Sequence, residues 1–254
     1  MDELSLQGRK VKRLTDIRAI FFDLDDTLLD DTVSSERSAE AVARELAGDR
    51  GIEPSDLARA YLDCAIDFWE TLEPGSPKPA SGAIRPSIWR KALANYGIDD
   101  ADLALRLARR YDLDRLERVE LFPGTLPVLR QLHGRYKLAI ITNGFAETHD
   151  AKIARLELAR FFDSVILAGE LALVKPDPAV FRHAMDAAGV GPEESVMVGD
   201  RFERDVVGAH AAGMRAIWVK CRDETIPDGA RPPEAVISSI AQLPEVLARH
   251  FSNS

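Results

Sequence analysis

The stretch IRAIFFDLDDTL, residues 17–28, joins a short apolar run to a cluster of acidic residues. The run is short and rich in bulky aliphatic and aromatic residues, which predicts a buried strand of a parallel sheet. Side chains two positions apart on an extended segment point the same way, so Asp23 and Asp25 can face one site. This stretch therefore predicts the first strand of the fold and a pair of carboxylates at its end.

Similar apolar runs recur later in the chain and alternate with segments of helical apolar spacing. Further strands are expected at 138–141, 164–167, 196–198, 216–219 and 235–237, and helices at 127–132, 178–188 and 205–212. Such alternation predicts an α/β fold with a Rossmann-like parallel sheet covered by helices on both faces. Ligands bind such sheets beyond the carboxyl ends of the strands, so the polar residues there are candidates for chemistry.

Residues 31–119 break this alternation and contain no convincing strand. Amphipathic helices are expected near 35–47, 56–72, 84–96 and 101–116, with a Pro/Gly/Ser-rich loop at 74–79. A helical domain of residues 31–119 inserted after the first strand explains this pattern, with residues 1–30 and 120–254 forming the core domain. A continuous single domain with extra helices is the alternative, and it would leave the site unchanged.

The composition is typical of a globular protein with a net negative charge. Hydrophobic residues make up 46% of the 254 residues, and the formal net charge is −9. Phosphate-backbone binders usually carry a basic face, so nucleic acid is not an expected partner.

Cys64 and Cys221 form no CxxC motif, which favours two reduced thiols. No apolar run approaches the roughly 18 residues of a membrane span and no secretory signal is present, so no membrane partner and a cytoplasmic location are expected.

Asp23 and Asp25 suit metal-assisted phosphate chemistry. Neighbouring carboxylates repel each other, and a hard cation such as Mg²⁺, which prefers oxygen ligands, relieves that repulsion. Asp23 can attack phosphorus, while Asp25 can protonate the leaving oxygen and later deprotonate water. The first step needs a protonated Asp25, so we expect its pKa to lie above that of a free carboxylic acid. The alternative is an ordinary acidic run between a strand and a loop.

Polar residues follow the later strands as well. The hydroxyl of Thr142 and the turn at Asn143 can grip phosphate oxygens, and Lys175 can supply a compact positive charge. Asp200 would complete a metal site that Asp205 supports. Taken singly, these residues are equally consistent with an Asn-Gly turn, a solvated lysine and a helix-start aspartate. The specific signal is their order at successive strand ends of one sheet.

These motifs closely resemble those of the haloacid dehalogenase-like (HAD) hydrolase superfamily, in its phosphatase branch with a helical cap between the first and second motifs. The matching segments are DLDDTL at 23–28, TNG at 142–144, Lys175-Pro176, and Gly199-Asp200 with Asp205. The resemblance implies a nucleophile at Asp23, an acid/base at Asp25, and phosphate binding by Thr142, Asn143 and Lys175. It also implies Mg²⁺ held by Asp23, Asp200 and the backbone carbonyl of Asp25, with Asp205 assisting directly or through water.

Within that superfamily, the carboxylic acid at Asp25 points to phosphate transfer, because members that cleave carbon–halogen bonds lack it. Segments 26–30 and 142–145 resemble those of phosphatases acting on sugar phosphates, nucleotides or sialic acid phosphates. The expected function is therefore a Mg²⁺-dependent phosphatase that hydrolyses a small phosphorylated metabolite through an aspartyl phosphate on Asp23. A phosphomutase, a dehalogenase and a non-catalytic phospho-acceptor are the alternatives, and the oligomeric state stays open.

Several other side chains are weaker candidates. In the helical insertion, four residues could contact a substrate, namely Trp69, Arg85, Trp89 and Arg90. The alternative is packing in the core of the insertion, which is favoured because tryptophan at helical spacing is usually buried. His149 is expected to be a surface residue. Arg201 replaces the small hydroxyl residue frequent after this aspartate in the family, and is expected to tune phosphate binding or to pair with Glu203.

Overall fold

The computed structural model describes residues 17–251 except 48–49, 72–79, 169 and 172. Residues 1–16 of the expected core domain and the expected loop at 74–79 therefore lie outside the described residues. Among those described, no helix combines the length and apolar character needed to cross a bilayer.

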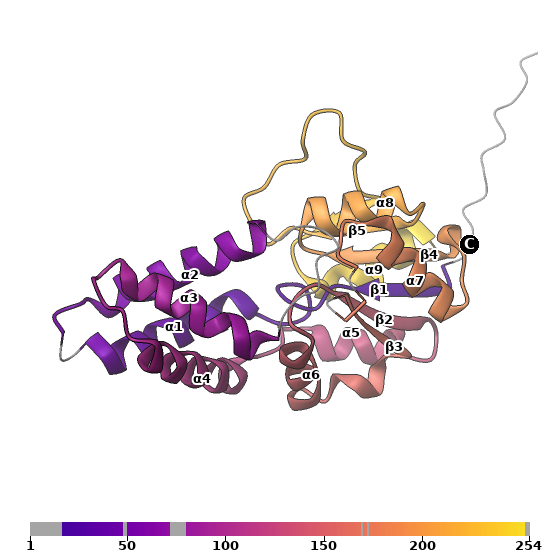
Figure 1. The fold of residues 1–254 in the computed structure, drawn as a ribbon. Helices are drawn as coiled ribbons and strands as arrows, with labels where there is room; N and C mark the ends of the chain where they lie inside the picture. Colours follow the sequence, from indigo (N-terminus) through magenta and orange to yellow (C-terminus); the bar gives the residue numbers. More distant parts are fainter. Residues whose placement is uncertain (1–16, 48–49, 72–79, 169, 172, 252–254) are drawn as a thin grey trace, which may run out of the picture.

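Six parallel strands form one sheet in the order β3-β2-β1-β4-β5-β6 (Figure 1). The strands are β1 Ala19–Phe22, β2 Lys137–Thr142, β3 Ser164–Leu167, β4 Ser195–Gly199, β5 Arg215–Val219 and β6 Ala235–Ile237. Phe22 lies in register with Ile140 on β2 and with Val198 on β4. The carboxyl ends of these three strands therefore meet at one edge, where the strand order reverses direction. The expected α/β fold class is confirmed.

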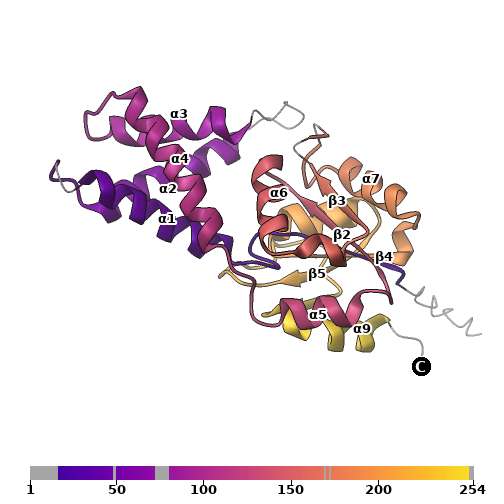
Figure 2. The ribbon, with the colours of Figure 1, turned by 90° about the horizontal axis from the view of Figure 1, so that it is seen from below.

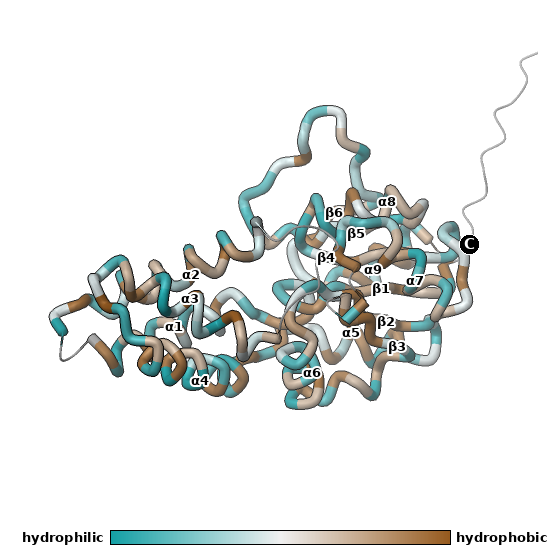
Figure 3. Tube along the Cα trace, in the orientation of Figure 1, coloured by the Kyte–Doolittle hydropathy of each residue, from teal (hydrophilic) through white to brown (hydrophobic). Residues whose placement is uncertain are grey.

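Both faces of the sheet are covered by helices, which explains why its strands are apolar throughout. On one face, Ile20 and Phe22 pack against α5 Thr125–Leu132 and α9 Leu243–Phe251 (Figure 2). On the other face, Phe21 packs with α7 Pro178–Ala188 and α8 Gly208–Ala211. The hydropathy colouring accordingly places brown segments along the strands and teal segments on the outer helices (Figure 3).

Between β1 and β2, four helices pack around a core of their own. They are α1 Asp31–Ala47, α2 Pro54–Thr71, α3 Ser81–Ala94 and α4 Ala101–Arg118, called the bundle below. Leu57, Tyr61 and Trp89 lie at the centre of this core. The bundle projects to one side of the sheet (Figure 1). The expected boundaries between a helical domain and a core domain stay a prediction.

Local hydrogen bonds set the start of the bundle. Asp26 has a φ of 59°, in the left-handed region that Asp tolerates better than most residues. Its carboxylate accepts from the backbone N–H groups of Asp31 and Thr32, at 3.1 and 2.9 Å, and so caps the first turn of α1. The helix consequently begins at residue 31 rather than near the expected residue 35.

The helix expected at 205–212 is replaced by a π-helix, η3 Phe202–Val207, that leads into α8. Asp205 lies against Gly199, where an added Cβ would come within 2.3 Å of the aspartate Cγ. Glycine is therefore required at the end of β4. The remaining short elements are α6 Ala146–Arg155, η1 Leu158–Phe161, η2 Pro192–Glu194 and η4 Ile240–Gln242.

Glu234, just before β6, generates a pH-dependent stability prediction. Burial alone would raise the pKa of Glu234, but hydrogen bonds from His210 and from the Ala216 N–H lower it to about 2. A depressed folded-state pKa contributes stability that is present above the unfolded value of about 4.3 and is lost as the pH falls through about 2.

Glu234→Gln should therefore lower the free energy of unfolding at pH 7 by about 1 kcal/mol, a value reduced for solvent screening of this partly exposed group. Urea unfolding at pH 7 and pH 3 measures the difference, which should shrink at the lower pH. Glu245→Gln, at an exposed helical ion pair with Arg249, is the control and should have little effect. An equal loss at both pH values for Glu234→Gln would contradict the prediction.

Candidate active site

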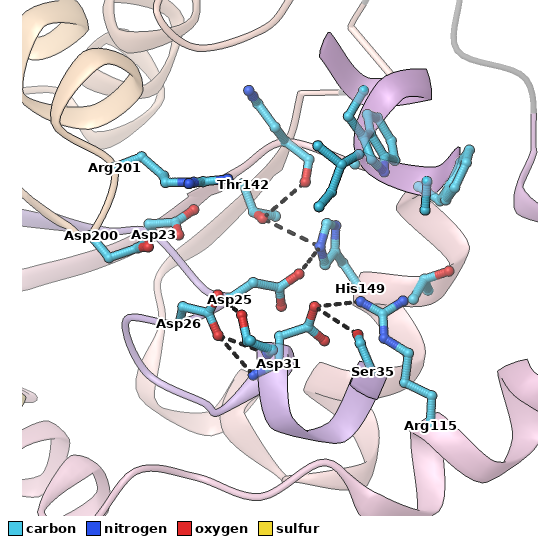
Figure 4. A pocket seen from close by; sticks show the side chains of 18 of the residues that line it. Asp23, Asp25, Asp26, Asp31, Ser35, Arg115, Thr142, His149, Asp200 and Arg201 are labelled. Atoms are coloured by element: carbon cyan, nitrogen blue, oxygen red, sulfur yellow. Dashed lines mark hydrogen bonds and ion pairs between the residues drawn. The ribbon is translucent and has the colours of Figure 1, made fainter. Parts of the chain in front are cut away.

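A cavity of about 450 Å³ lies between the carboxyl edge of the sheet and the bundle (Figure 4). The site residues expected from the sequence all line it, namely Asp23, Asp25, Thr142, Asn143, Lys175, Asp200 and Asp205. They come from the ends of β1, β2 and β4 and from the segments that precede α7 and form η3. The sheet thus brings together residues that lie far apart in the sequence.

Lys175 joins two of the carboxylates. Its Nζ donates to Asp23 Oδ1 and to Asp205 Oδ1, at 2.6 Å each, and the side chain is almost fully buried. Asn143 positions this lysine: its Nδ2 donates to the Lys175 carbonyl and its Oδ1 accepts from the Lys175 N–H, both at 2.9 Å. The Asn143 side chain, expected to bind phosphate, is therefore occupied with the backbone of Lys175, a use that the sequence did not predict.

Asp23, Asp200 and Asp205 form a buried acidic cluster. Each offers a carboxylate oxygen within 4.8 Å of the others. Burial, reinforced by the Asp205 and Asp200 charges, raises the pKa of Asp23 well above its usual value, although Lys175 opposes the shift. Burial and the Asp205 charge also raise the pKa of Asp200 to about 6. The cluster holds more negative charge than its cationic neighbours balance, and its oxygen donors suit a hard divalent cation such as Mg²⁺.

Asp25 lines the same cavity, but among the described residues its carboxylate is not one of the clustered metal donors. It accepts hydrogen bonds from His149 Nε2 at 3.1 Å and Lys152 Nζ at 2.8 Å (Figure 4 shows the first). Burial would raise the pKa of Asp25, but the charges of Lys152 and His149 outweigh it and hold that pKa well below its usual value. The expectation of a raised pKa is therefore wrong for this arrangement.

His149 and Lys152 are site residues that the sequence reasoning missed. His149 is 3% exposed, which corrects the expectation of a surface position, and Lys152 is 1% exposed. Both lie on α6, and Lys152 also donates to Asp31 Oδ1 at 2.6 Å. Their spacing of three residues places them on one helix face, directly after the motif that ends β2. That spacing is the sequence signal from which a shared position at the site could have been predicted.

Arg222 is the other missed residue. Its guanidinium joins Asp200 Oδ2 to Asp26 Oδ2. The other oxygen of Asp200 accepts from Thr27 Oγ1 at 3.3 Å. Arg222 follows the carboxyl end of β5, so the strand-end rule applied to that strand would have identified it.

Thr142 keeps its hydroxyl available at the end of β2. Its nearest polar neighbours, the Asn143 carbonyl and His149 Nε2, lie 3.4 and 3.5 Å from Oγ1, both long for a hydrogen bond. Gly144 follows with a φ of 124°, and a Cβ there would come within 2.6 Å of the His149 ring. Glycine thus allows the turn to pass beside the buried histidine.

The four candidates in the bundle divide into two groups. Trp89 stacks on Tyr61, with ring centroids 4.0 Å apart in the bundle core, which confirms the expected packing role. Arg90 is exposed and pairs with Asp99, and neither it nor Trp89 lines the cavity. Trp69 and Arg85 do line it, and both lie beside the Phe145 ring.

Comparison with known proteins agrees with this geometry. The model of haloacid dehalogenase-like hydrolases matches residues 17–213. N-acylneuraminate-9-phosphatase of Mus musculus is 30% identical over 239 residues, covering 92% of this chain and 95% of the relative. Phosphoserine phosphatase of Thermus thermophilus is 34% identical over 223 residues, covering 80% and 88% of the two chains.

A solved structure shares the fold over nearly the whole chain. The 2-haloacid dehalogenase from Pseudomonas syringae pv. Tomato DC3000 aligns with a TM-score of 0.65 at 34% identity, covering 92% of this chain and 99% of that one. The sequence matches, the shared fold and the meeting of the expected motifs at one sheet edge lead to one conclusion: the chain belongs to the haloacid dehalogenase-like hydrolases.

Proposed function

We propose that this protein is a Mg²⁺-dependent phosphatase that hydrolyses a sugar phosphate, a nucleotide or a similar small phosphomonoester through an aspartyl phosphate on Asp23. The chain is a hydrolase of phosphoric monoesters, because it belongs to this family and its relatives of 30% and 34% identity are phosphatases. The single observation that carries the finer proposal is the buried Asp23 beside Lys175, with the acid/base candidate Asp25 two residues further along the same cavity.

In the first step, an Asp23 carboxylate oxygen attacks phosphorus, and the bond from phosphorus to the ester oxygen breaks. The leaving oxygen takes a proton from Asp25. The depressed pKa of Asp25 does not oppose this role, because the negative charge of a bound phosphate raises the pKa of a neighbouring carboxyl group. The contacts with His149 and Lys152 hold Asp25 in place.

In the second step, Asp25, now ionised, takes a proton from water as the water oxygen attacks phosphorus. The acyl phosphate bond breaks, inorganic phosphate leaves and Asp23 returns to a carboxylate. Lys175 and the available hydroxyl of Thr142 bind phosphate oxygens in both steps. This sequence avoids direct attack of water on a phosphate dianion.

Mg²⁺ fits the cluster of Asp23, Asp200 and Asp205, because three buried carboxylates offer oxygen donors within 4.8 Å of one another. Burial, together with the charges of the neighbouring aspartates, raises the pKa of Asp23 and of Asp200, and a bound cation would offset that effect. A bound Mg²⁺ ion would supply charge stabilisation for the phosphoryl group. Arg222 holds one oxygen of Asp200 and so orients the carboxylate.

The bundle is proposed to act as a cap over the cavity. Tyr61, Trp69 and Arg85 line the cavity from its helices, so a substrate in the cavity would contact both the bundle and the sheet edge. Such a lid excludes water and selects the substrate. The boundaries proposed for it remain residues 31–119.

A panel assay separates these proposals from their alternatives. Phosphate release from p-nitrophenyl phosphate, sugar phosphates and nucleotides is measured with Mg²⁺ and with EDTA, and halide release from 2-chloropropionate is measured in parallel. Metal-dependent phosphate release supports the proposal. Halide release without phosphate release indicates a dehalogenase, isomerised phosphate ester indicates a phosphomutase, and stable phosphorylation of Asp23 without turnover indicates a phospho-acceptor.

Asp23→Asn should lower phosphatase turnover by at least about 10³-fold, because an amide is a poor nucleophile toward phosphorus. Steady-state phosphate release at saturating substrate measures the loss. Asp186→Asn, the same change at an exposed position on α7 outside the cavity, is the matched control. Comparable turnover in the Asp23→Asn protein would overturn the mechanism.

Arg222→Gln should weaken Mg²⁺ binding about 10-fold, because partners that orient a metal-binding carboxylate typically contribute 10–100-fold to affinity. Isothermal titration with Mg²⁺ in the absence of substrate measures binding independently of turnover. Arg130→Gln, at an exposed site on α5, is the control. Unchanged or tighter Mg²⁺ binding in Arg222→Gln would show that the guanidinium does not support the site.

A further inference from the structure

Two arginines of the cavity take no part in the proposed reaction. Arg201 directly follows Asp200, and Arg204 lies within η3. Both side chains line the cavity that Asp23, Thr142 and Asp200 also line, and Figure 4 labels Arg201 among these lining residues. They therefore add positive charge to the cavity in which the phosphate is proposed to bind.

The other strongly basic side chains of the cavity are engaged by carboxylates. These pairs are Lys175 with Asp23 and Asp205, Arg222 with Asp26 and Asp200, Arg115 with Asp31, and Arg85 with Asp112. Their charges are accordingly offset within the protein.

Arg201 has only a long contact with a carboxylate, and Arg204 has none among the described residues. The contact of Arg201 is with Glu224 at 3.8 Å, too long for a hydrogen bond, and the two side chains are 46% and 35% exposed, so the pair is weak. This finding replaces the expected pairing of Arg201 with Glu203. For Arg204, no carboxylate of the described residues lies within ion-pair distance. Glu36 on α1 also lines the cavity, but no ion pair joins it to either arginine.

The cavity is larger than a phosphate group alone requires, and its lining includes apolar as well as charged side chains. Leu62, Ala65, Ile66 and Trp69 line it from α2, and Ile66 is 54% exposed. A volume of about 450 Å³ falls within the range of small-molecule sites. A ligand that fills it has a carbon body beyond its phosphate, and its further polar groups can reach η3.

We infer that Arg201 and Arg204 bind a second anionic group of the substrate, a carboxylate or a second phosphate, which makes the preferred substrate a phosphomonoester that is also an acid. The inference rests on the proposed phosphatase function. A guanidinium binds either group through paired N–H donors.

The test compares kcat/KM within pairs of substrates that differ in the second anion. O-phosphoserine is paired with O-phosphoethanolamine and 3-phosphoglycerate with glyceraldehyde 3-phosphate for a carboxylate, and fructose 1,6-bisphosphate with fructose 6-phosphate for a second phosphate. The wild type should prefer the member with the second anionic group in at least one pair by about 10-fold or more, the scale of a hydrogen bond to a charged group. The pair that shows the preference identifies the anion.

Arg201→Gln and Arg204→Gln should each reduce that ratio by about 10-fold, whereas Arg182→Gln, at an exposed site on α7, should leave the ratio unchanged. Circular dichroism and Tm verify the fold of each variant. Turnover of all pairs without a preference, or a preference that both variants retain, would overturn the inference and leave the phosphatase function intact. No turnover of any phosphomonoester, including p-nitrophenyl phosphate, would overturn the proposed function and the inference together.

Discussion

Electrostatic repulsion among Asp23, Asp200 and Asp205 is the constraint around which the site is arranged. These carboxylates are buried and lie close enough to share a cation, so the fold must hold them together against their own charge. Lys175 bridges two of them, and Arg222 binds the third. The parallel sheet keeps these carboxylates in place, because the strand ends that carry Asp23 and Asp200 are fixed by adjacent ladders of hydrogen bonds.

One helix, α6, contacts the proposed acid/base Asp25 and also attaches the bundle to the sheet domain. From α6, Lys152 contacts both Asp25 and Asp31, the first residue of α1. Arg155 of α6 donates to the carbonyls of Leu116 and Glu117, at 2.9 Å each, near the end of α4. The residue proposed to move protons and the helices proposed to select the substrate are thus positioned by one element.

Much of this arrangement follows from local sequence signals. The apolar runs predict the six strands, and the strand-end rule identifies Asp23, Thr142 and Asp200, because each follows its strand directly. His149 and Arg222 carry weaker signals, namely the three-residue spacing of His149 from Lys152 and the position of Arg222 after β5, since a single histidine or arginine looks the same in the sequence whether it is solvated or buried. Their roles arise from which helix or loop the fold places over Asp25 and Asp200.

The π-helix and the lowered pKa of Asp25 could not be predicted from the sequence either. The π-helix η3 accompanies the close contact of Asp205 with Gly199, and a contact of this kind cannot be predicted from the spacing of apolar residues. The pKa of Asp25 depends on charges that come from α6 and from Arg115 on α4. Both properties depend on distances between segments that are remote in the sequence.

The central position of β1 has a consequence for the order of folding. Ala19 pairs with Lys137 on one side and with Ser195 on the other, so the middle of the sheet closes long loops of chain. The bundle, in contrast, is built from consecutive helices with contacts that are local by comparison. Because closing long loops costs entropy before pairing compensates for it, we expect local helical structure to form early and the central sheet to form late. The edge of the sheet that carries the proposed site is then complete only after the chain has been made as far as Arg222, and a nascent chain that ends before residue 175 carries Asp23 without Lys175, Asp200 and Asp205.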